Sequence, residues 1–360
     1  MNMKHTNTIF SILLFSIFTC GFLQCTTDED TKINTPKQQI PVKLISPAFD
    51  TQYSIGAEIN VEIKVNDASK IKELSLYIAD TLYAKNLKLE SQTIKITSQK
   101  GNVGFIDLYL AYTDEKGVAH RDNRRLVFFS DITPKQQFAN IINTYTHNTS
   151  SYTQGLEFYK GKLYESTGQK GNSLLTEVDL YSGNQVRKVD LAPQFFGEGL
   201  TILNDTIYQI TWQSRVCKLY DMEFNSIGEF HYEGEGWGLC NDGKSIIMTN
   251  GLSEIVWRNP QTFEIEKTIF AFADQQDYQQ LNEIELINDK LYANVYTTNN
   301  IIEIDTSSGK VLSVISCNNI ALEGKVNGAD VLNGIAYNPI TQKTYLTGKL
   351  WPKIFEVTFE

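Results

Sequence analysis

Histidine and cysteine are scarce in this chain of 360 residues. The four histidines show neither the HxH nor the HExxH spacing that binds zinc. They are His5, His120, His147 and His231. The five cysteines include no CxxC pair, and the three beyond residue 25 are Cys217, Cys240 and Cys317. The sequence therefore predicts buried, inert thiols, with no disulfide framework and no metal site.

Positive charge is also in deficit. Lysine and arginine number 32 against 42 aspartates and glutamates, which gives a formal net charge of -10. Binding to nucleic-acid phosphates requires clustered basic residues on one face, and the sequence contains no basic run. Nucleic acid is therefore excluded as a partner, and neutral or cationic partners are expected.

Long apolar runs are absent except near the amino terminus. Lys4 and His5 precede the apolar segment 9–23, which is short for a membrane span and typical of an export signal. Cys25, followed by the polar segment 26–30, is typical of the lipid-acceptor cysteine of a bacterial lipoprotein. We expect a signal over 1–25 and a polar linker over 26–40. The mature protein is then a periplasmic or outer-membrane-anchored lipoprotein, with plain secretion as the alternative.

Residues 41–131 alternate apolar and polar side chains with the period of half-buried strands. The clearest run is Ile59, Val61, Ile63 and Val65. About six such strands, separated by turns that contain Asp, Asn and Gly, predict a small immunoglobulin-like β-sandwich. No group in this segment suggests chemistry.

Residues 136–360 contain an internal repeat. Each repeat begins with a polar or aromatic residue, then usually Gly, then Leu or Ile. The five occurrences are Gln154-Gly155-Leu156, Glu198-Gly199-Leu200, Trp237-Gly238-Leu239, Asn282-Glu283-Ile284 and Asn333-Gly334-Ile335, at intervals of 44, 39, 45 and 51 residues. Further apolar strands follow in each repeat. Four short strands per repeat are typical of a propeller blade, so we predict an all-β fold with a five-bladed β-propeller after the sandwich.

The last repeat ends after its third strand, at Glu360. The segment 139–145, just before the first repeat, is expected to supply the missing fourth strand and so close the ring. Such closure removes an exposed sheet edge.

In a propeller the residues that open the innermost strands meet at one mouth of the central channel. This first column consists of Gln154, Glu198, Trp237, Asn282 and Asn333. A second column, 14 or 16 residues further along, consists of Gly168, Trp212, Gly251, Tyr296 and Lys349. Five different side chains in one column favour a site over a scaffold. The two columns predict a pocket with aromatic walls, one carboxylate and one ammonium group.

These positions lie in motifs that occur in order over about 220 residues. The motifs are Tyr152-Thr153-Gln154-Gly155-Leu156, Phe196-Gly197-Glu198-Gly199-Leu200, Thr211-Trp212, Glu235-Gly236-Trp237-Gly238-Leu239, Asn282-Glu283-Ile284-Glu285-Leu286, Val331-Leu332-Asn333-Gly334-Ile335 and Thr347-Gly348-Lys349-Leu350-Trp351-Pro352-Lys353. The set resembles plant- and bacterial-type glutaminyl-peptide cyclotransferases. The resemblance implies an enzyme that cyclises the N-terminal glutamine of peptides to pyroglutamate and releases ammonia, without a metal or other cofactor. We expect a monomer.

The resemblance also implies roles for individual residues. Glu198 is the expected general acid and base, since aromatic neighbours would desolvate it and raise its pKa. Asn282 and Lys349 are expected to stabilise the oxyanion, with Lys353 as the competing lysine. Substrate binding is assigned to Tyr152, Gln154, Phe196, Trp212, Trp237, Tyr296 and Asn333.

Two positions depart from the family pattern. Tyr296 replaces the usual tryptophan and Tyr152 the usual phenylalanine, so altered kinetics are expected. Two rival interpretations stay open: a non-catalytic propeller that binds peptides at the same mouth, and a calcium-dependent hydrolase of the lactonase type. The hydrolase would require several carboxylates around one axial cation, whereas the two columns supply one.

Overall fold

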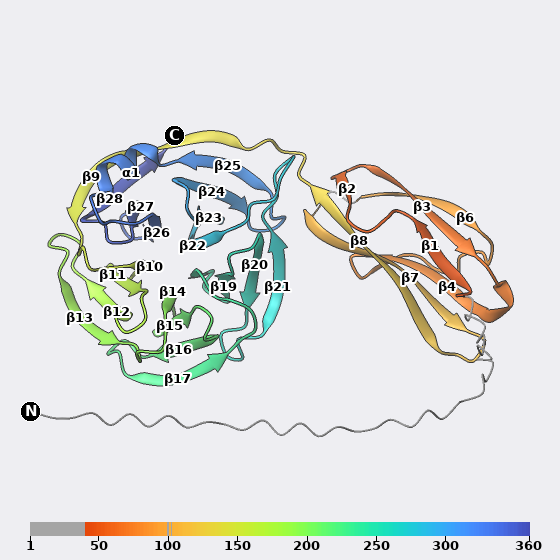
Figure 1. Ribbon diagram of the computed structural model, residues 1–360, viewed down its shortest axis with the longest axis horizontal. Coiled ribbons are helices and arrows are strands. Elements are labelled where there is room, and N and C mark those ends of the chain that lie inside the picture. Colours follow the sequence, from red (N-terminus) through yellow and green to blue (C-terminus); the bar gives the residue numbers. More distant parts are fainter. Residues whose placement is uncertain (1–39, 99–100, 102) are drawn as a thin grey trace, which may run out of the picture. The chain divides into compact units, whose positions relative to one another are not determined.

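The computed structural model describes residues 40–98, 101 and 103–360, and this part of the chain is all-β, as predicted (Figure 1). The exceptions are one short α-helix, α1 (Asn318–Gly324), and one 3-10 turn, η1 (Ala68–Lys70). The expected signal over 1–25, with Cys25, lies outside the described residues. Within the described ranges, no helix combines the length and the apolar character that crossing a bilayer would require.

Residues 42–129 form two sheets. The smaller, with strand order β1-β3-β6, is antiparallel; it comprises β1 (Val42–Ser46), β3 (Glu58–Val65) and β6 (Gln92–Thr97). The larger has the order β2-β8-β7-β4-β5 and comprises β2 (Thr51–Ser54), β4 (Ile71–Ile78), β5 (Thr81–Ala84), β7 (Gly104–Asp114) and β8 (Ala119–Phe129). Strand β2 pairs with β8 in parallel, which the alternation in the sequence did not indicate.

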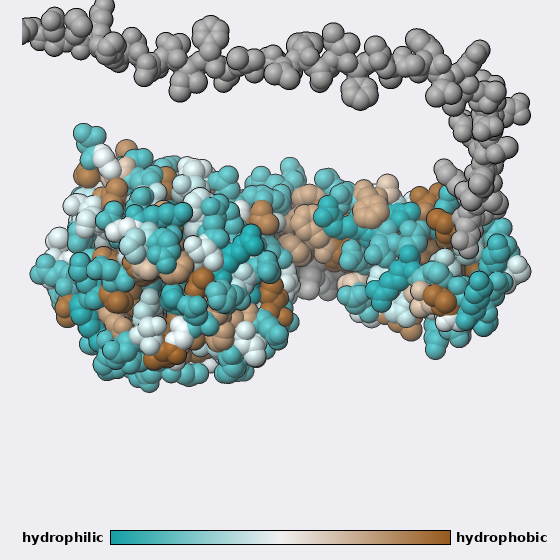
Figure 2. Space-filling model, turned by 60° about the horizontal axis from the view of Figure 1, so that its bottom comes forward, coloured by the Kyte–Doolittle hydropathy of each residue, from teal (hydrophilic) through white to brown (hydrophobic). Residues whose placement is uncertain are grey.

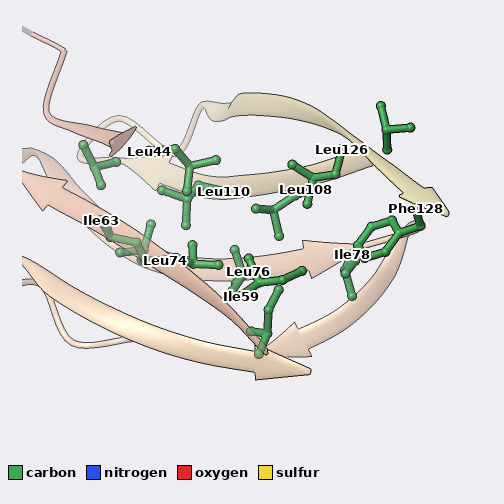
Figure 3. Close-up of a cluster of buried hydrophobic side chains, with 14 of the residues drawn as sticks. Leu44, Ile59, Ile63, Leu74, Leu76, Ile78, Leu108, Leu110, Leu126 and Phe128 are labelled. Carbon is green, nitrogen blue, oxygen red and sulfur yellow. The ribbon is translucent and has the colours of Figure 1, made fainter. Parts of the chain in front are cut away.

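Apolar side chains from both sheets gather in one cluster (Figure 3). In β3 every second residue of the first six is buried, so Ile59, Val61 and Ile63 point inward. Leu74 and Leu76 of β4 and Leu108 of β7 belong to the same cluster. Burial of such side chains contributes about 1.5–3 kcal/mol each.

Three sheets of four consecutive antiparallel strands follow along the chain. The first comprises β10 (Thr153–Tyr159), β11 (Lys162–Thr167), β12 (Leu174–Val178) and β13 (Gln185–Asp190). The second comprises β14 (Gly197–Leu203), β15 (Thr206–Thr211), β16 (Val216–Tyr220) and β17 (Ser226–His231). The third comprises β18 (Leu239–Asn241), β19 (Ile246–Thr249), β20 (Glu254–Arg258) and β21 (Ile265–Phe270).

The remaining strands share one eight-stranded sheet, in the order β22-β23-β24-β25-β9-β28-β27-β26. They are β9 (Lys135–Thr146), β22 (Leu281–Ile287), β23 (Lys290–Val295), β24 (Asn300–Asp305), β25 (Val311–Ser316), β26 (Leu332–Asn338), β27 (Lys343–Gly348) and β28 (Lys353–Phe359). As expected, β9 completes the last repeat, pairing antiparallel with β28. Its first residues, 135–138, also pair in parallel with β25, and this second pairing was not predicted.

The first strand of each repeat lies innermost in a ring of sheets (Figure 1). Strands β10, β14, β18, β22 and β26 each contact the next, and β26 contacts β10. The circle of inner strands is therefore closed. The face of the molecule seen in Figure 2 is mostly polar, with apolar residues singly or in small groups.

The inner strands approach one another backbone to backbone. A Cβ atom added to Gly199 would lie 2.4 Å from the backbone nitrogen of Leu239, in the next sheet. One added to Gly155 would lie 2.5 Å from the backbone nitrogen of Leu200. Only glycine fits at such a distance, which explains the second residue of the first three repeats, where Gly238 likewise meets the carbonyl oxygen of Asn282.

Glu283 takes the place of this glycine in the fourth repeat. Its buried carboxylate accepts hydrogen bonds from the backbone N–H groups of Leu156 (3.3 Å) and Ile335 (2.8 Å). These two residues belong to β10 and β26, so one side chain links three inner strands. Burial raises the pKa of Glu283 well above its usual value.

We predict that Gly199→Ala lowers the free energy of unfolding by about 1–3 kcal/mol, because the new methyl group meets backbone that cannot move aside. Gly228→Ala in β17 is the matched control, since a Cβ there meets only Leu219 Cδ1, at 3.6 Å. Urea unfolding curves of both variants test the prediction. Equal stability of the two would contradict the backbone packing described above.

Candidate active site

A cavity of about 220 Å³ opens at one mouth of the ring. Nine side chains line it: Tyr152, Gln154, Phe196, Glu198, Trp212, Trp237, Asn282, Tyr296 and Lys349. All nine were assigned to a site from the sequence, and the structure brings them together. Asn333 is the one assigned catalytic or binding residue that does not line the cavity.

β-Bulges interrupt four of the five inner strands at residues of the first column. The strand register shifts at Thr153/Gly155 in β10, and between Gly197 and Leu200 in β14. Corresponding shifts interrupt β22 and β26 at Asn282 and Asn333. A bulge turns a side chain away from the alternating pattern of its strand, and bulges are common beside active sites.

Glu198 is buried, with an exposed fraction of 5%. Loss of hydration raises the pKa of its carboxyl group well above the usual value, and the negative charge of Glu235 adds to the rise. The positive charge of Lys349 and a hydrogen bond from the Gln154 side chain act in the opposite direction but do not outweigh burial. The raised pKa favours a carboxyl group that can hold a proton and give it up, as a general acid and base must.

Lys349 is also buried, with an exposed fraction of 2%. Its Nζ atom lies over two aromatic rings, 5.0 Å from the ring centre of Tyr152 and 4.8 Å from that of Tyr296. Burial lowers the pKa of this lysine to about 8, although the charges of Glu198 and Asp330 favour the protonated form. One acid and one base thus share a single aromatic cavity.

A tight turn after β27 holds Lys349. Its backbone N–H donates to the carbonyl of Val331 (2.9 Å), and Leu350, at a φ of 63°, donates to the carbonyl of Ser151 (2.7 Å). The carbonyl of Trp351 lies 2.9 Å from Nδ1 of His147. These contacts tie the lysine to the first repeat.

His147 and Glu165 form a buried pair behind this turn. Nε2 of His147 lies 3.1 Å from Oε1 of Glu165, which also accepts from Thr153 Oγ1 at 2.7 Å. Burial alone would lower the pKa of His147, but the adjacent carboxylate raises it above the usual value. The pair joins the start of β10 to the turn that carries the lysine.

Lys353, the competing lysine, lies elsewhere. Its Nζ atom is 3.4 Å from Oε2 of Glu323, and the side chain is 36% exposed. The structure therefore assigns the cavity position to Lys349.

Aromatic rings form the walls of the cavity. Phe196 and Trp212 meet with their ring centres 5.8 Å apart, and Trp237 meets Tyr296 at 5.6 Å and 88°. Glycines of the second column make room for these rings. A Cβ on Gly168 would lie 2.4 Å from the ring of Phe196, and one on Gly251 would lie 2.6 Å from that of Trp237. The sequence indicated only that the glycines leave space. The structure shows that the rings of Phe196 and Trp237 occupy this space.

Asn333 does not line the cavity but holds Gln154 by a side-chain hydrogen bond. Its Nδ2 atom donates to Oε1 of Gln154 (3.1 Å) and to the carbonyl of Thr153 (3.0 Å). Because the Gln154 side-chain oxygen accepts from Asn333, its NH2 group is the part that donates the hydrogen bond to Glu198 described above. Asn333 therefore orients a residue of the site, in contrast to the substrate contact expected from its place in the column.

The side-chain amide of Asn282 has an oxygen atom without a hydrogen-bond partner among the described residues. The backbone carbonyl of Asn282 accepts from Thr249 Oγ1 (2.7 Å), which fixes the main chain. The side-chain oxygen, Oδ1, is buried. An unpaired buried amide is costly unless a ligand completes it.

Two acidic residues near the site were missed in the sequence. Glu235 accepts hydrogen bonds from the indole N–H groups of Trp212 and Trp237. Asp330 accepts from the hydroxyl of Tyr152 at 2.8 Å. Both lie in loops between repeats, outside the two columns. The only available signal was the position of Glu235 within the Trp237 motif.

No group of three or more His, Cys, Asp or Glu side chains within 40–98, 101 and 103–360 is arranged to hold a metal ion. The thiols of Cys217, Cys240 and Cys317 are buried and unpaired, as expected.

Comparisons with known proteins cover the part of the chain that contains this site. A family model described as glutamine cyclotransferase matches residues 118–359. The chain is 32% identical over 234 residues to a glutaminyl-peptide cyclotransferase of Arabidopsis thaliana, covering 63% of this chain and 73% of that protein. It is also similar to the crystal structure of Myxococcus xanthus glutaminyl cyclase, with 31% identity, a TM-score of 0.60, and coverage of 63% of this chain and 99% of that one.

Because the pKa of Lys349 is lower in the folded protein than in the unfolded chain, the free energy of unfolding depends on pH. The unfolded state holds the lysine proton up to about pH 10.4, whereas the folded state releases it near pH 8. This group therefore lowers stability at pH 7, and its penalty shrinks as the pH rises from 8 to 10. We predict that Lys349→Met raises the free energy of unfolding at pH 7 by roughly 1–2 kcal/mol, after the loss of its ring contacts.

Urea unfolding at pH 7, 8, 9 and 10 measures the effect, with Lys353→Met as the control. The gain from Lys349→Met should fade toward pH 10, and the control should show no such trend. A gain that is constant across this range would contradict a buried, charged lysine.

Proposed function

The chain belongs to the glutamine cyclotransferase family, and we propose that it is a glutaminyl-peptide cyclotransferase that converts the N-terminal glutamine of peptides to pyroglutamate with release of ammonia. The observation that carries this proposal is the burial of Glu198 and Lys349 in one aromatic cavity with two side-chain amides. The ring of sheets is, on this proposal, a five-bladed β-propeller, and residues 42–129 an immunoglobulin-like sandwich. The four-stranded sheets and the closed circle of inner strands support the first assignment.

Ring closure requires the flexible glutamine side chain to fold back onto its own α-amine. The rings of Phe196, Trp212, Trp237 and Tyr296 enclose the cavity and would hold this folded conformation. Holding the reacting atoms together before reaction removes much of the entropic part of the barrier. The α-nitrogen then attacks the side-chain amide carbon, forming the C–N bond of the lactam.

Protons must move in both directions during this reaction. The attacking nitrogen loses a proton, and the departing amide nitrogen gains one as its C–N bond breaks and ammonia leaves. Glu198 is proposed to do both, taking the first proton and delivering it to the leaving group. A carboxyl group with a raised pKa is suited to this shuttle, because it holds a proton more readily than an ordinary carboxylate does.

Negative charge develops on the amide oxygen in the tetrahedral intermediate. Lys349 and Asn282 line the same cavity and are proposed to donate hydrogen bonds to this oxygen. Removal of one such donor typically costs about 10²–10³ in rate. Each step balances within the substrate and these side chains, and the proposed mechanism uses no metal.

The amino-terminal segment belongs to the same proposal. The apolar run 9–23 and Cys25 support export followed by lipidation, with plain secretion as the alternative. In a bacterial host fed labelled palmitate, we expect label on the wild-type protein and none on Cys25→Ser. Absence of label on the wild-type protein would contradict lipidation and favour plain secretion.

The central prediction concerns Glu198. We expect Glu198→Gln to lower the turnover number by about 10²–10⁴, because the amide cannot carry the proton, while peptide binding persists. The assay uses the full chain and a Gln-initiated peptide, with ammonia release and the corresponding loss of mass as readouts. A peptide beginning with alanine corrects for background, and an excess of chelator should leave the wild-type rate unchanged.

A wild type that binds the Gln-initiated peptide without releasing ammonia would instead favour the non-catalytic binding protein. Loss of activity in chelator would overturn the metal-independent mechanism alone. Full activity of Glu198→Gln would overturn the role of this residue.

A further inference from the structure

Glu235 lies between β17 and β18, and one of its oxygen atoms joins two walls of the cavity. Oε2 accepts a hydrogen bond from Nε1 of Trp212 at 2.7 Å and from Nε1 of Trp237 at 3.1 Å. Trp212 follows β15 and Trp237 precedes β18, so the walls come from two different sheets. Oε1 accepts a third hydrogen bond, from Nε2 of Gln213 at 3.0 Å.

This arrangement determines what the walls present to a substrate. Each indole has a single polar atom, its N–H group, and both of these groups are bound to Glu235. The rings therefore contribute apolar surface to the cavity. The polar contacts left for the substrate come from Gln154, Glu198, Asn282 and Lys349, together with the tyrosine hydroxyls.

The side chain of Glu235 is ionised at neutral pH. Partial burial would raise the pKa of its carboxyl group, but the hydrogen bonds from Gln213, Trp237 and Trp212 outweigh burial and hold the pKa below its usual value. Charge-assisted hydrogen bonds of this kind are about twice as strong as neutral ones. A fixed negative charge thus stands beside the cavity.

That charge acts on Glu198. The charged or titratable groups that affect the pKa of Glu198 are Lys349, which lowers it, and Glu235, which raises it. Tyr152, Tyr232 and Tyr296 also face Glu198 but stay neutral, since burial raises the pKa of each hydroxyl. The charge of Asp330 acts on Lys349, and the charge of Arg215 acts on Glu235. Glu235 is thus the one carboxylate among them that opposes ionisation of Glu198.

We propose that Glu235 is a positioning residue of the cyclisation reaction, which fixes Trp212 and Trp237 as apolar walls and adds a fixed negative charge to the surroundings of Glu198. This inference rests on the proposed function for its kinetic consequences. Its structural part, the clamp on two indoles, stands independently of turnover.

Three variants separate the two effects. Glu235→Gln keeps an oxygen that can accept from the indoles but removes the charge. Glu235→Ala removes both the oxygen and the charge. Glu233→Gln is the matched control, because Glu233 lies two residues away on the same loop with a side chain that is 97% exposed.

We expect Glu235→Gln to keep the wild-type KM and to move the inflection in kcat/KM assigned to Glu198 toward lower pH, because a charge that opposed ionisation is gone. Glu235→Ala should show the same shift together with a KM about tenfold higher, since the walls are released. Glu233→Gln should match the wild type in both measurements. An unmoved inflection in Glu235→Gln would overturn the electrostatic role.

The clamp is tested without substrate by acrylamide quenching of tryptophan fluorescence. Of the four tryptophans, Trp257 and Trp351 are buried, so the quenchable emission comes mainly from Trp212 and Trp237. Glu235→Ala should be quenched more strongly than the wild type, and Glu235→Gln and Glu233→Gln should not. Equal quenching of all four proteins would overturn the clamp. If the wild-type protein shows no turnover, the proposed function is overturned. The quenching experiment then still tests whether Glu235 holds the two indoles.

Discussion

The close approach of backbones at the centre of the ring is the constraint on which the site depends. A Cβ atom on Gly155, Gly199 or Gly238 would lie 2.5, 2.4 or 2.3 Å from the backbone of the next inner strand. Because these positions have no side chain, the strands pack tightly enough for the residues before them to meet at one mouth. The bulges in β10, β14 and β22 then turn Gln154, Glu198 and Asn282 into a common cavity.

Burial of an acid and a base in that cavity supplies its chemistry. Glu198 and Lys349 attract each other, yet for both groups the loss of hydration is the larger effect, so the pKa of the acid rises and that of the base falls. The aromatic walls cause this, because they exclude the water that would stabilise either charge. Glu235 holds two of those walls and adds its own charge, which links the shape of the cavity to its electrostatics.

Closure of the ring is equally necessary. Tyr152 and Gln154 belong to the first repeat and Lys349 to the last, almost 200 residues later. They meet because β9 pairs with β28 and β10 contacts β26. The buried pair of His147 and Glu165 strengthens this junction, since it joins the segment after β9 to the turn that holds the lysine. The site therefore forms only when both ends of the repeat region are in place.

The sequence by itself determined the all-β class, the repeats and nine of the ten side chains assigned to the site. Strand alternation and repeat spacing are local patterns, and equivalent positions of a repeat occupy equivalent places in a ring, which accounts for the fold class and seven of the nine residues. Tyr152 and Phe196 lie outside the two columns and were assigned from the resemblance to the family motifs alone. Only the tertiary structure decided that Asn333 supports Gln154, that Lys349 and not Lys353 enters the cavity, and that Glu235 and Asp330 belong to the site. These outcomes depend on loops between repeats and on the directions of individual side chains. Such contacts join residues from different repeats and follow no period, so they exist only once the ring has closed.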